Sequence, residues 1–340
     1  HRIYSYALSL VGWLKGGLGH VNVVGSVVFA GMSGTAIADA AGLGTIEIKA
    51  MVDHGYEPEF AVGVTAASAT LGPIIPPSLP FVIYGMMANV SVGSLFLAGI
   101  APGGVMAILM MLTVAYFAHK HGWGGDVKFE WPKLIKALTE TLIVVGWPLA
   151  MWLCISELDT PPQWTVLIGL LVLFTADKLF SFQAVLPIMT PVLLIGGMTT
   201  GVFTPTEGAI AACVWALVLG FAWYRTLTLK LFVKICLETV ETTATVLFIV
   251  AAASIFGWML TATGVTSAIS QWVLGVTDQP WQFLLLANLL MLFVGCFSEP
   301  TAAITILVPI LLPICRQLGI DPVHFGLIRS EEHTSELQSH

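Results

Sequence analysis

Hydroxyl groups, a glycine and four prolines are concentrated between Ala66 and Pro80, inside a chain that is otherwise strongly apolar. Proline lacks a backbone donor and obstructs the carbonyl four residues earlier, so carbonyl groups in this segment lose their helical partners. A bilayer tolerates such backbone only where protein or a water-filled cavity satisfies it. The segment therefore predicts a broken helix that binds a cation or an anionic substrate group, although a kinked packing helix is the alternative. Its candidate ligands are Ser68, Thr70, Gly72 and Pro76.

A second group of small and polar residues lies between Gly31 and Gly44. We expect Ser33, Gly34 and Thr35 to form the tip of a helical hairpin, which turns carbonyl and hydroxyl oxygens inward. Neutral oxygens suit Na⁺, a hard cation, by the same preference that governs calcium and magnesium. The alternative is a tight contact between helices through small residues.

Asp39 lies in the same apolar stretch. A carboxylate at the centre of a membrane costs roughly 2.5 to 3.5 kcal/mol on insertion scales, so it normally faces protein or a cavity. Two interpretations stay open at this point. Asp39 contributes to an ion or substrate site, or it braces the hairpin through backbone amides.

A third group begins the segment from Gly295 to Pro313, where Ser298, Glu299 and Thr301 precede an apolar arm. It loosely repeats the Ser33 region, as expected of transporters built from inverted repeats, although chance would also produce such a likeness. Glu299 could act as a gate, a coupling group or a brace. Across the three groups, the candidate Na⁺ ligands are Ser33, Gly34, Ser68, Gly72 and Ser298.

The residues from Thr204 to Glu207 predict the N-terminus of a helix. Threonine, proline and glutamate at this spacing form a capping box, with Thr204 as the N-cap, Pro205 at the first helical position and Glu207 closing the box. We therefore expect a helix to begin here.

The composition restricts the fold class. Hydrophobic residues make up 57% of the chain and charged residues 10%, against about 25% charged in soluble proteins. Long runs such as Val92 to Phe117 can cross a bilayer as helices, and the alternating pattern of outer-membrane barrels is absent. We predict an all-α polytopic membrane protein. The sequence has no HExxH, GxSxG or P-loop motif and no basic cluster, so neither an enzyme nor a nucleic-acid-binding protein is expected.

Four stretches, in this order, resemble the large membrane subunit of tripartite ATP-independent periplasmic (TRAP) transporters. They are GLGHVNVVGSVVFAGMSGTAIADAAGLG, TAASATLGPIIPPSLPFVIYG, GGMTTGVFTPTEGAIAA, and EPTAAITILVPILLP followed by GIDPVHFG. The resemblance implies an elevator-type fold with two inverted repeats, each with a re-entrant hairpin and a broken helix. It also implies sodium-coupled uptake of organic acids across the bacterial cytoplasmic (inner) membrane. The implied partners are a periplasmic solute-binding protein and a small four-helix membrane subunit.

The resemblance also implies a domain organisation. Residues 1–125 would form a partial first repeat, 126–183 an amphipathic linker with an extra pair of spans, and 184–328 a partial second repeat. Residues 329–340 read as a non-native tail. Carried onto this sequence, the first ion site would use Ser33, Gly34, Thr35, Ser68, Thr70 and Gly72, and the second Ser298, Glu299 and Thr301.

Three departures from the family pattern stand out. Thr35 replaces the more common serine, which keeps the oxygen and adds a methyl group. The extra spans between Trp131 and Gln183 are unusual, and both ends lack family segments, so we expect the chain as written not to transport. Two other functions remain possible on the residues alone: a divalent-anion symporter that needs no binding protein, and an ion channel.

Overall fold

The computed structural model describes residues 2–125, 130–132, 134–143, 146, 186, 189–199, 203–276, 279–295 and 300–328. The described part is helical and contains no β-strand, which agrees with the predicted all-α class. Its first half contains α1 Arg2–Val11, α2 Gly17–Ser33, α3 Ala36–Asp39, the π-helical turn η1 Ala40–Gly44, α4 Thr45–Asp53, α5 Pro58–Ala69, α6 Leu79–Ala88 and α7 Val92–His121. Its second half contains α10 Met189–Thr199, α11 Pro205–Val218, the π-helical turn η4 Leu219–Trp223, α12 Leu229–Ala262, α13 Val265–Val276, α14 Pro280–Gly295 and α15 Pro300–Gln317.

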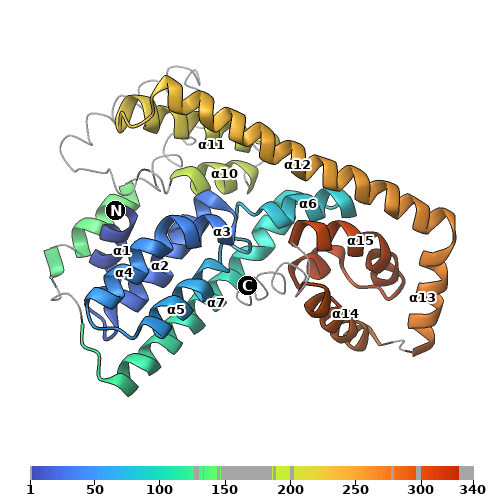
Figure 1. The fold of residues 1–340 in the computed structure, drawn as a ribbon, viewed down its shortest axis with the longest axis horizontal. Helices are drawn as coiled ribbons and strands as arrows, with labels where there is room; N and C mark the ends of the chain where they lie inside the picture. The colour runs from blue at the N-terminus through green and yellow to red at the C-terminus, as the bar shows by residue number, and fades with distance from the viewer. Residues whose placement is uncertain are drawn as a thin grey trace.

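The first half is built around α2. This helix packs against α1, α5 and α7, and the chain returns from its end through α3, η1 and α4, as Figure 1 shows. Apolar side chains surround the polar face of α2, and Val21 and Val23 are fully buried. The predicted hairpin is therefore present, and α5 lies along its side.

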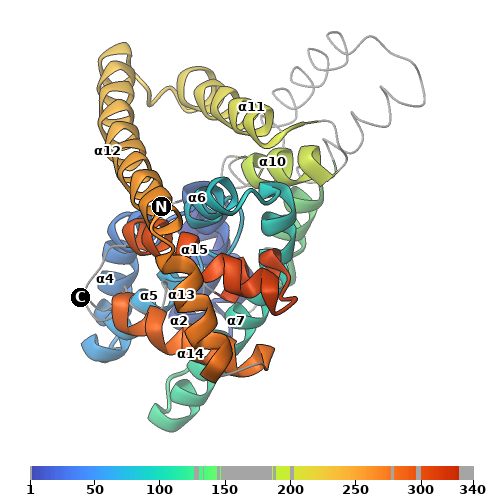
Figure 2. The ribbon, with the colours of Figure 1, turned by 90° about the vertical axis from the view of Figure 1, so that its right-hand side faces the viewer.

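Three of the described helical segments are long and apolar enough to cross a membrane. They are Val92–His121, Pro205–Trp223 and Leu229–Leu260. The expected run from Val92 to Phe117 is confirmed as a helix and continues to His121, where Gly122 ends it with a positive φ of 71°. Figure 2 shows the beginning of α12 extending away from the other helices, whereas α11 packs against α10. Only a small part of the apolar stretches of Pro205–Trp223 and Leu229–Leu260 is buried, so their remaining apolar faces are open to lipid or to a partner.

Two features of the second half differ from what hydropathy suggests. α12 begins at Leu229, so it includes a more polar stretch before the apolar run that starts at Thr243. Lys234 and Glu238, one turn apart in the polar stretch, form an exposed ion pair at 3.6 Å, which adds a small stabilisation to the helix there. Helix α13 follows α12, although its polar Ser, Thr and Gln residues interrupt the apolar pattern.

The extra pair of spans predicted within residues 126–183 lies outside the described residues, apart from residue 130, which is not helical, and the helical residues 131–132, 134–143 and 146. The tail at residues 329–340 also lies outside them. Both therefore stay predictions.

The capping box that begins α11 is confirmed. The Thr204 hydroxyl accepts from the Glu207 amide at 3.4 Å, and the Glu207 carboxylate accepts from the Thr204 amide at 2.8 Å. These bonds satisfy two amides that the first helical turn would otherwise leave without partners.

We expect Thr204→Ala to lower the free energy of unfolding by about 1 kcal/mol, because it removes the N-cap acceptor. The melting temperature of the purified protein in detergent measures this loss. Thr206→Ala is the matched control, since Thr206 lies in the same exposed turn outside the box. Equal effects of the two changes would contradict a capping role for Thr204.

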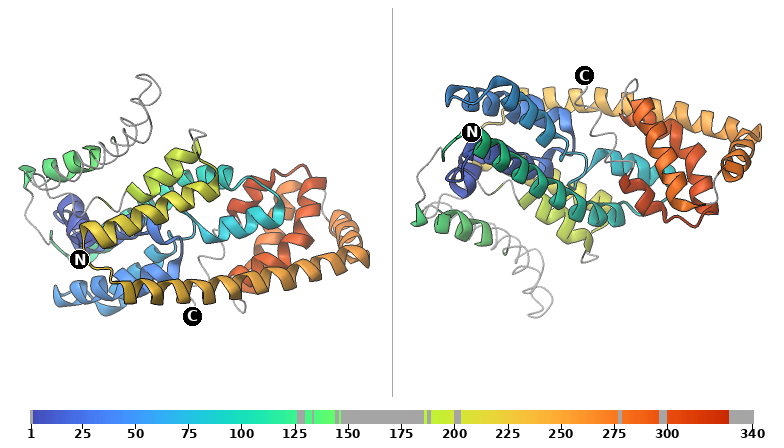
Figure 3. Two further views of the ribbon diagram at one scale, coloured as in Figure 1. Left: turned by 90° about the horizontal axis from the view of Figure 1, so that it is seen from above. Right: turned by 90° about the horizontal axis from the view of Figure 1, so that it is seen from below.

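The first-half helix α6 packs in the second half of the molecule. It lies beside α15, as Figures 1 and 3 both show, and its buried Phe81 and Tyr84 belong to the largest apolar core together with Phe283. The Tyr84 hydroxyl donates to the Pro322 carbonyl at 2.6 Å, and Arg316 donates to the Ala88 carbonyl at 3.1 Å. The break before α6 therefore separates a helix packed in the first half from one packed in the second.

Candidate functional site

The hairpin tip is a tight turn between α2 and α3. Gly34 ends α2 in the left-handed region, with φ 64°, and its amide donates to the Ala30 carbonyl at 3.2 Å. Thr35 then caps α3, because its hydroxyl accepts from the Ala38 amide at 3.4 Å. Glycine adopts this backbone conformation at low cost, whereas a side chain would be strained. The expectation that Ser33, Gly34 and Thr35 form the turn is thus met.

The broken segment joins α5 to α6. Helix α5 ends at Ala69, and the next residues form successive turns until Ser78 caps α6. The Ser78 hydroxyl accepts from the Phe81 amide at 3.3 Å and donates to the Pro73 carbonyl. Pro76 is buried and joined to Pro77 by a cis peptide bond. The prolines interrupt the helix as predicted, and the hydroxyl of Ser78 holds the two ends of the break together.

The tip and the broken segment lie directly against each other. The Leu79 amide donates to the Gly34 carbonyl at 3.4 Å. A Cβ atom on Gly34 would collide with the Pro77 carbonyl oxygen, and one on Gly72 would lie 3.0 Å from the Thr35 carbonyl oxygen. Two backbones can approach this closely only because both positions are glycine. We call Ser33, Gly34, Thr35, Gly72 and Pro77 the tip contact.

The tip contact is rich in neutral oxygens. Backbone carbonyls of Thr35 and Pro77 line it. Among the described residues, the half-buried Ser33 hydroxyl has only one long hydrogen bond, of 3.5 Å, to the Thr35 carbonyl. Neutral oxygens at a break in a helix are suitable ligands for a hard cation. Binding of Na⁺ at Ser33, Gly34, Thr35, Gly72 and Pro76 stays a prediction.

Ser68 and Thr70 make their contacts elsewhere. Ser68 is fully buried, and its hydroxyl donates to the Asn22 side-chain oxygen at 2.6 Å. The Thr70 hydroxyl donates to the Ala67 carbonyl of its own helix at 2.6 Å. Neither hydroxyl has a hydrogen bond with a residue of the tip contact, so the structure places Ser68 in the body of the hairpin. A role of either residue as an ion ligand stays a prediction.

A buried polar network links Ser68 to three helices. The Asn22 amide group on α2 donates to Glu47 at 2.8 Å and to Thr65 at 2.7 Å, and the Ser26 hydroxyl donates to Ser68 at 3.0 Å. All five side chains are at most 4% exposed. We call Asn22, Ser26, Glu47, Thr65 and Ser68 the hairpin network.

The sequence interpretation missed Asn22, Ser26, Glu47 and Thr65. A signal was present, because Asn22 and Ser26 are four residues apart, and polar residues at that spacing share one face of an apolar helix. Thr65 and Ser68, three residues apart, do the same on α5.

Asp39 is buried at the end of α3, with 2% of its surface exposed. Its side chain is close enough to Ser26 for an electrostatic interaction, but neither carboxylate oxygen has a partner within hydrogen-bonding geometry among the described residues. One oxygen of Glu47, Oε1, is likewise buried without a partner there. The bracing interpretation of Asp39 requires backbone amides as donors to its oxygens, and the described residues supply none.

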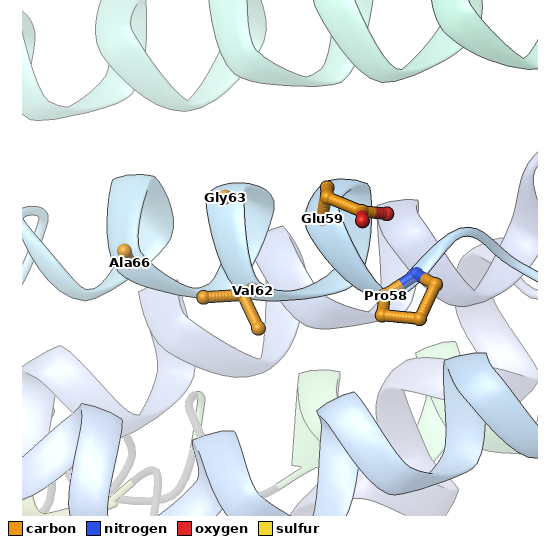
Figure 4. Close-up of a pocket in the computed structure, with 5 residues that line it drawn as sticks. All are labelled: Pro58, Glu59, Val62, Gly63 and Ala66. Carbon is orange, nitrogen blue, oxygen red and sulfur yellow. The ribbon is translucent and has the colours of Figure 1, made fainter.

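A shallow groove on α5 lies apart from these residues. Figure 4 shows that Pro58, Glu59, Val62, Gly63 and Ala66 line it, and all five come from α5. Thr65 and Ser68 of the hairpin network are buried, while Pro58, Glu59, Val62 and Gly63 are exposed. The groove is therefore on the outer face of the helix, away from the hairpin interior.

The second predicted ion site falls mostly outside the described residues. Ser298 and Glu299 are not described, and Thr301 lies in the first turn of α15 with its side chain not described. Whether Ser298, Glu299 and Thr301 lie near the tip contact therefore stays a prediction. Within the described ranges, no group of His, Cys, Asp and Glu has the arrangement of a metal site.

Comparison with known proteins covers nearly the whole chain. The family model described as "Tripartite ATP-independent periplasmic transporter, DctM component" matches residues 1–329. The sialic acid TRAP transporter large permease protein SiaM of Vibrio cholerae is 40% identical over 327 residues, which are 96% of this chain and 66% of the relative. The sialic acid TRAP transporter permease protein SiaT of Haemophilus influenzae is 36% identical, over 96% of this chain and 46% of the relative. The C4-dicarboxylate TRAP transporter large permease protein DctM of Pseudomonas aeruginosa is 33% identical, over 96% and 66%.

Proposed function

The chain belongs to the DctM family of tripartite ATP-independent periplasmic (TRAP) transporter components, and we propose that it acts as the large permease subunit of a sodium-coupled importer of organic acid anions. This is a transport function and not an enzymatic one. The chain spans 66% of the length of SiaM and 46% of that of SiaT. The proposed activity is therefore that of a full-length subunit which includes this chain.

One observation carries the proposal: the hairpin tip lies against the broken segment. The approach of Gly34 to Pro77 and of Gly72 to Thr35 places backbone carbonyls from two interrupted helices at one point. Such a point suits Na⁺, and a bound cation lowers the electrostatic cost of moving an anion through a membrane. A shift of the hairpin and its substrate across the membrane, as in elevator transporters, is part of the proposal.

The substrate class follows from the relatives. The names of SiaM, SiaT and the Pseudomonas aeruginosa DctM specify sialic acid or C4-dicarboxylates, all of which are organic acids. We extend this class, but no single acid, to the present protein. The described residues of the tip contact and the hairpin network include no Lys or Arg, so sodium is the proposed source of positive charge.

Two protein partners are part of the proposal. A periplasmic solute-binding protein would deliver the acid, and a small four-helix membrane subunit would cover part of the outer surface. The exposed apolar side chains of α12, such as Leu237, Phe248 and Trp258, are available to that subunit or to the bilayer. The protein would be located in the bacterial cytoplasmic (inner) membrane.

Reconstitution tests the proposal. The complete reading frame, its small subunit and its binding protein are placed in vesicles, and uptake of a radiolabelled acid is measured with and without an inward Na⁺ gradient. We expect saturable accumulation that requires both the gradient and the binding protein. Uptake that persists without the binding protein would favour a symporter that works alone, and passive flux without saturation would favour a channel.

A further inference from the structure

The beginning of α12 is an amphipathic surface that extends away from the other helices, as Figure 2 shows. Lys230, Lys234, Glu238 and Glu241 follow one another at intervals of four, four and three residues, so they lie along one stripe of the helix. Exposed apolar side chains occupy most of the remaining circumference, namely Leu229, Leu231, Val233, Ile235, Leu237 and Val240. A helix that exposes apolar side chains beside a charged stripe is suited to a membrane surface.

A shallow groove follows the basic part of this surface. It is lined by Thr228, Lys230, Leu231, Val233, Lys234 and Leu237, which we call the basic groove. Two ammonium groups therefore lie beside apolar side chains, and no acid is among the lining residues. Arg225 precedes the helix, and between Trp223 and Leu237 the chain has three basic residues and no acidic one.

The order of charges along the stripe is unfavourable for the helix itself. The N-terminal end of a helix carries a partial positive charge, which favours acids there and disfavours lysines. α12 has the reverse order, since Lys230 lies in its first turn and Glu241 three turns later. The pair of Lys234 and Glu238 is also in the weaker order, because glutamate before lysine is the better one. Helix stability thus does not explain the lysines, whereas an anionic ligand does.

Both ammonium groups are accessible to such a ligand. The side chain of Lys234 is 70% exposed, and its exposed ion pair with Glu238 contributes little. Lys230 has no ion pair with a described residue. The helix continues from Thr242 to Ala262 without a charged residue, as the hydrocarbon core requires. The basic groove is therefore on the headgroup side of this span.

We propose that the basic groove binds an anionic phospholipid. Lys230 and Lys234 contact the phosphate of the headgroup, and Leu231, Val233 and Leu237 contact the adjoining acyl chain. Charged lipids attract basic residues next to a span. A soluble anion would satisfy the two lysines but leave the apolar side chains in water, whereas a lipid covers both parts of the groove. The proposal depends on neither the sodium coupling nor the substrate.

Lipid binding to the purified protein tests the site directly. The full-length subunit that includes this chain is stripped of lipid in detergent and titrated with phosphatidylglycerol, or with phosphatidylcholine of the same acyl chains. Native mass spectrometry counts the bound lipids. The variants are Lys230→Gln, Lys234→Gln, both changes together, and Glu238→Gln. Lys49→Gln is the matched control, because Lys49 is an exposed lysine on α4.

We expect phosphatidylglycerol to bind more tightly than phosphatidylcholine, and added salt to reduce the difference. Lys230→Gln should weaken phosphatidylglycerol binding about fivefold, and the double change about tenfold or more. Lys234→Gln alone should have the smaller effect, because Glu238 already offsets part of that charge. Glu238→Gln should strengthen binding about twofold, since it releases Lys234. Lys49→Gln should leave binding unchanged.

Four results would overturn the proposal. In the first, the unchanged protein binds both lipids equally tightly. In the second, Lys49→Gln weakens binding as much as Lys230→Gln, which indicates unspecific attraction. In the third, glycerol phosphate displaces the lipid at equal concentration, which indicates a site for a soluble anion. In the fourth, the small membrane subunit displaces the lipid, which indicates a protein partner.

A gain-of-binding variant covers the case in which the lysine variants fail to fold. Glu238→Gln keeps both lysines and removes only an exposed acid. Weaker or unchanged phosphatidylglycerol binding by this variant would contradict the proposal. Vesicle uptake that ignores the Na⁺ gradient, with lipid binding intact, would contradict only the proposed transport function.

Discussion

Replacing Gly34 by alanine is expected to lower the free energy of unfolding by about 2 to 5 kcal/mol. A non-glycine residue in the left-handed region costs about 1 to 2 kcal/mol, and overpacking typically costs about 1 to 3 kcal/mol more. Both costs apply, because Gly34 has φ 64° and its Cβ would collide with the Pro77 carbonyl oxygen. The tip would be forced away from the broken segment. Chemical denaturation or melting in detergent measures the loss, and Na⁺-driven uptake should fall with it.

Gly122→Ala provides a matched control for this prediction. Gly122 also ends a helix in the left-handed region, with φ 71°, and its amide likewise donates to the carbonyl four residues earlier. A Cβ there meets nothing within 4 Å. The difference between the two variants therefore isolates the collision with Pro77. Equal losses would show that the tip and the broken segment are not in contact.

Replacing Asn22 by alanine is expected to lower the free energy of unfolding by about 3 kcal/mol. The change removes the partner of Glu47 Oε2 and the acceptor of the Ser68 hydroxyl, and it leaves Thr65 with one bond fewer. Each buried polar group without a partner costs about 1 to 3 kcal/mol, and members of such a network depend on one another. Melting of the purified variant measures the effect.

Asn22→Asp tests separately whether the amide group that donates to Glu47 is needed. It keeps the size and the acceptor for Ser68, but it replaces the donor to Glu47 by another carboxylate oxygen. We expect a loss at least as large as that of Asn22→Ala at neutral pH, because a third acid would enter the hairpin interior. Near-normal stability of both variants would show that the hairpin network contributes little.

Much of the first half was predictable, because its signals are local. Consecutive prolines cannot continue a helix, and a glycine between small polar residues permits a tight turn, so the break after Ala69 and the turn at Gly34 follow from residue types alone. The capping box at Thr204 is local in the same way. The all-α membrane class follows from composition.

The spacing of Asn22 and Ser26 and of Thr65 and Ser68 marks two polar helix faces, but which of these faces meet in the hairpin network could not be predicted, because that depends on how helices are paired and rotated. Asn22 and Glu47 are 25 residues apart, and Asn22 and Ser68 are 46 apart. Nothing in the local sequence says which face of α2 meets which face of α5. The placement of Ser68 near Ser26, and not at the tip, has the same origin. The beginning of α12 at Leu229 is hidden for another reason, since hydropathy does not detect the polar helical turns that precede Thr243.

The packing of α6 beside α15 has a consequence for the integrity of the molecule. Phe81 and Tyr84 belong to the first half of the sequence but complete the apolar core of the second half. Hydrogen bonds from Tyr84 to Pro322 and from Arg316 to Ala88 connect the two halves. A cut between the halves would therefore leave each product with an unfinished interior. The α6 helix is thus a part of the second half that the first half of the sequence encodes.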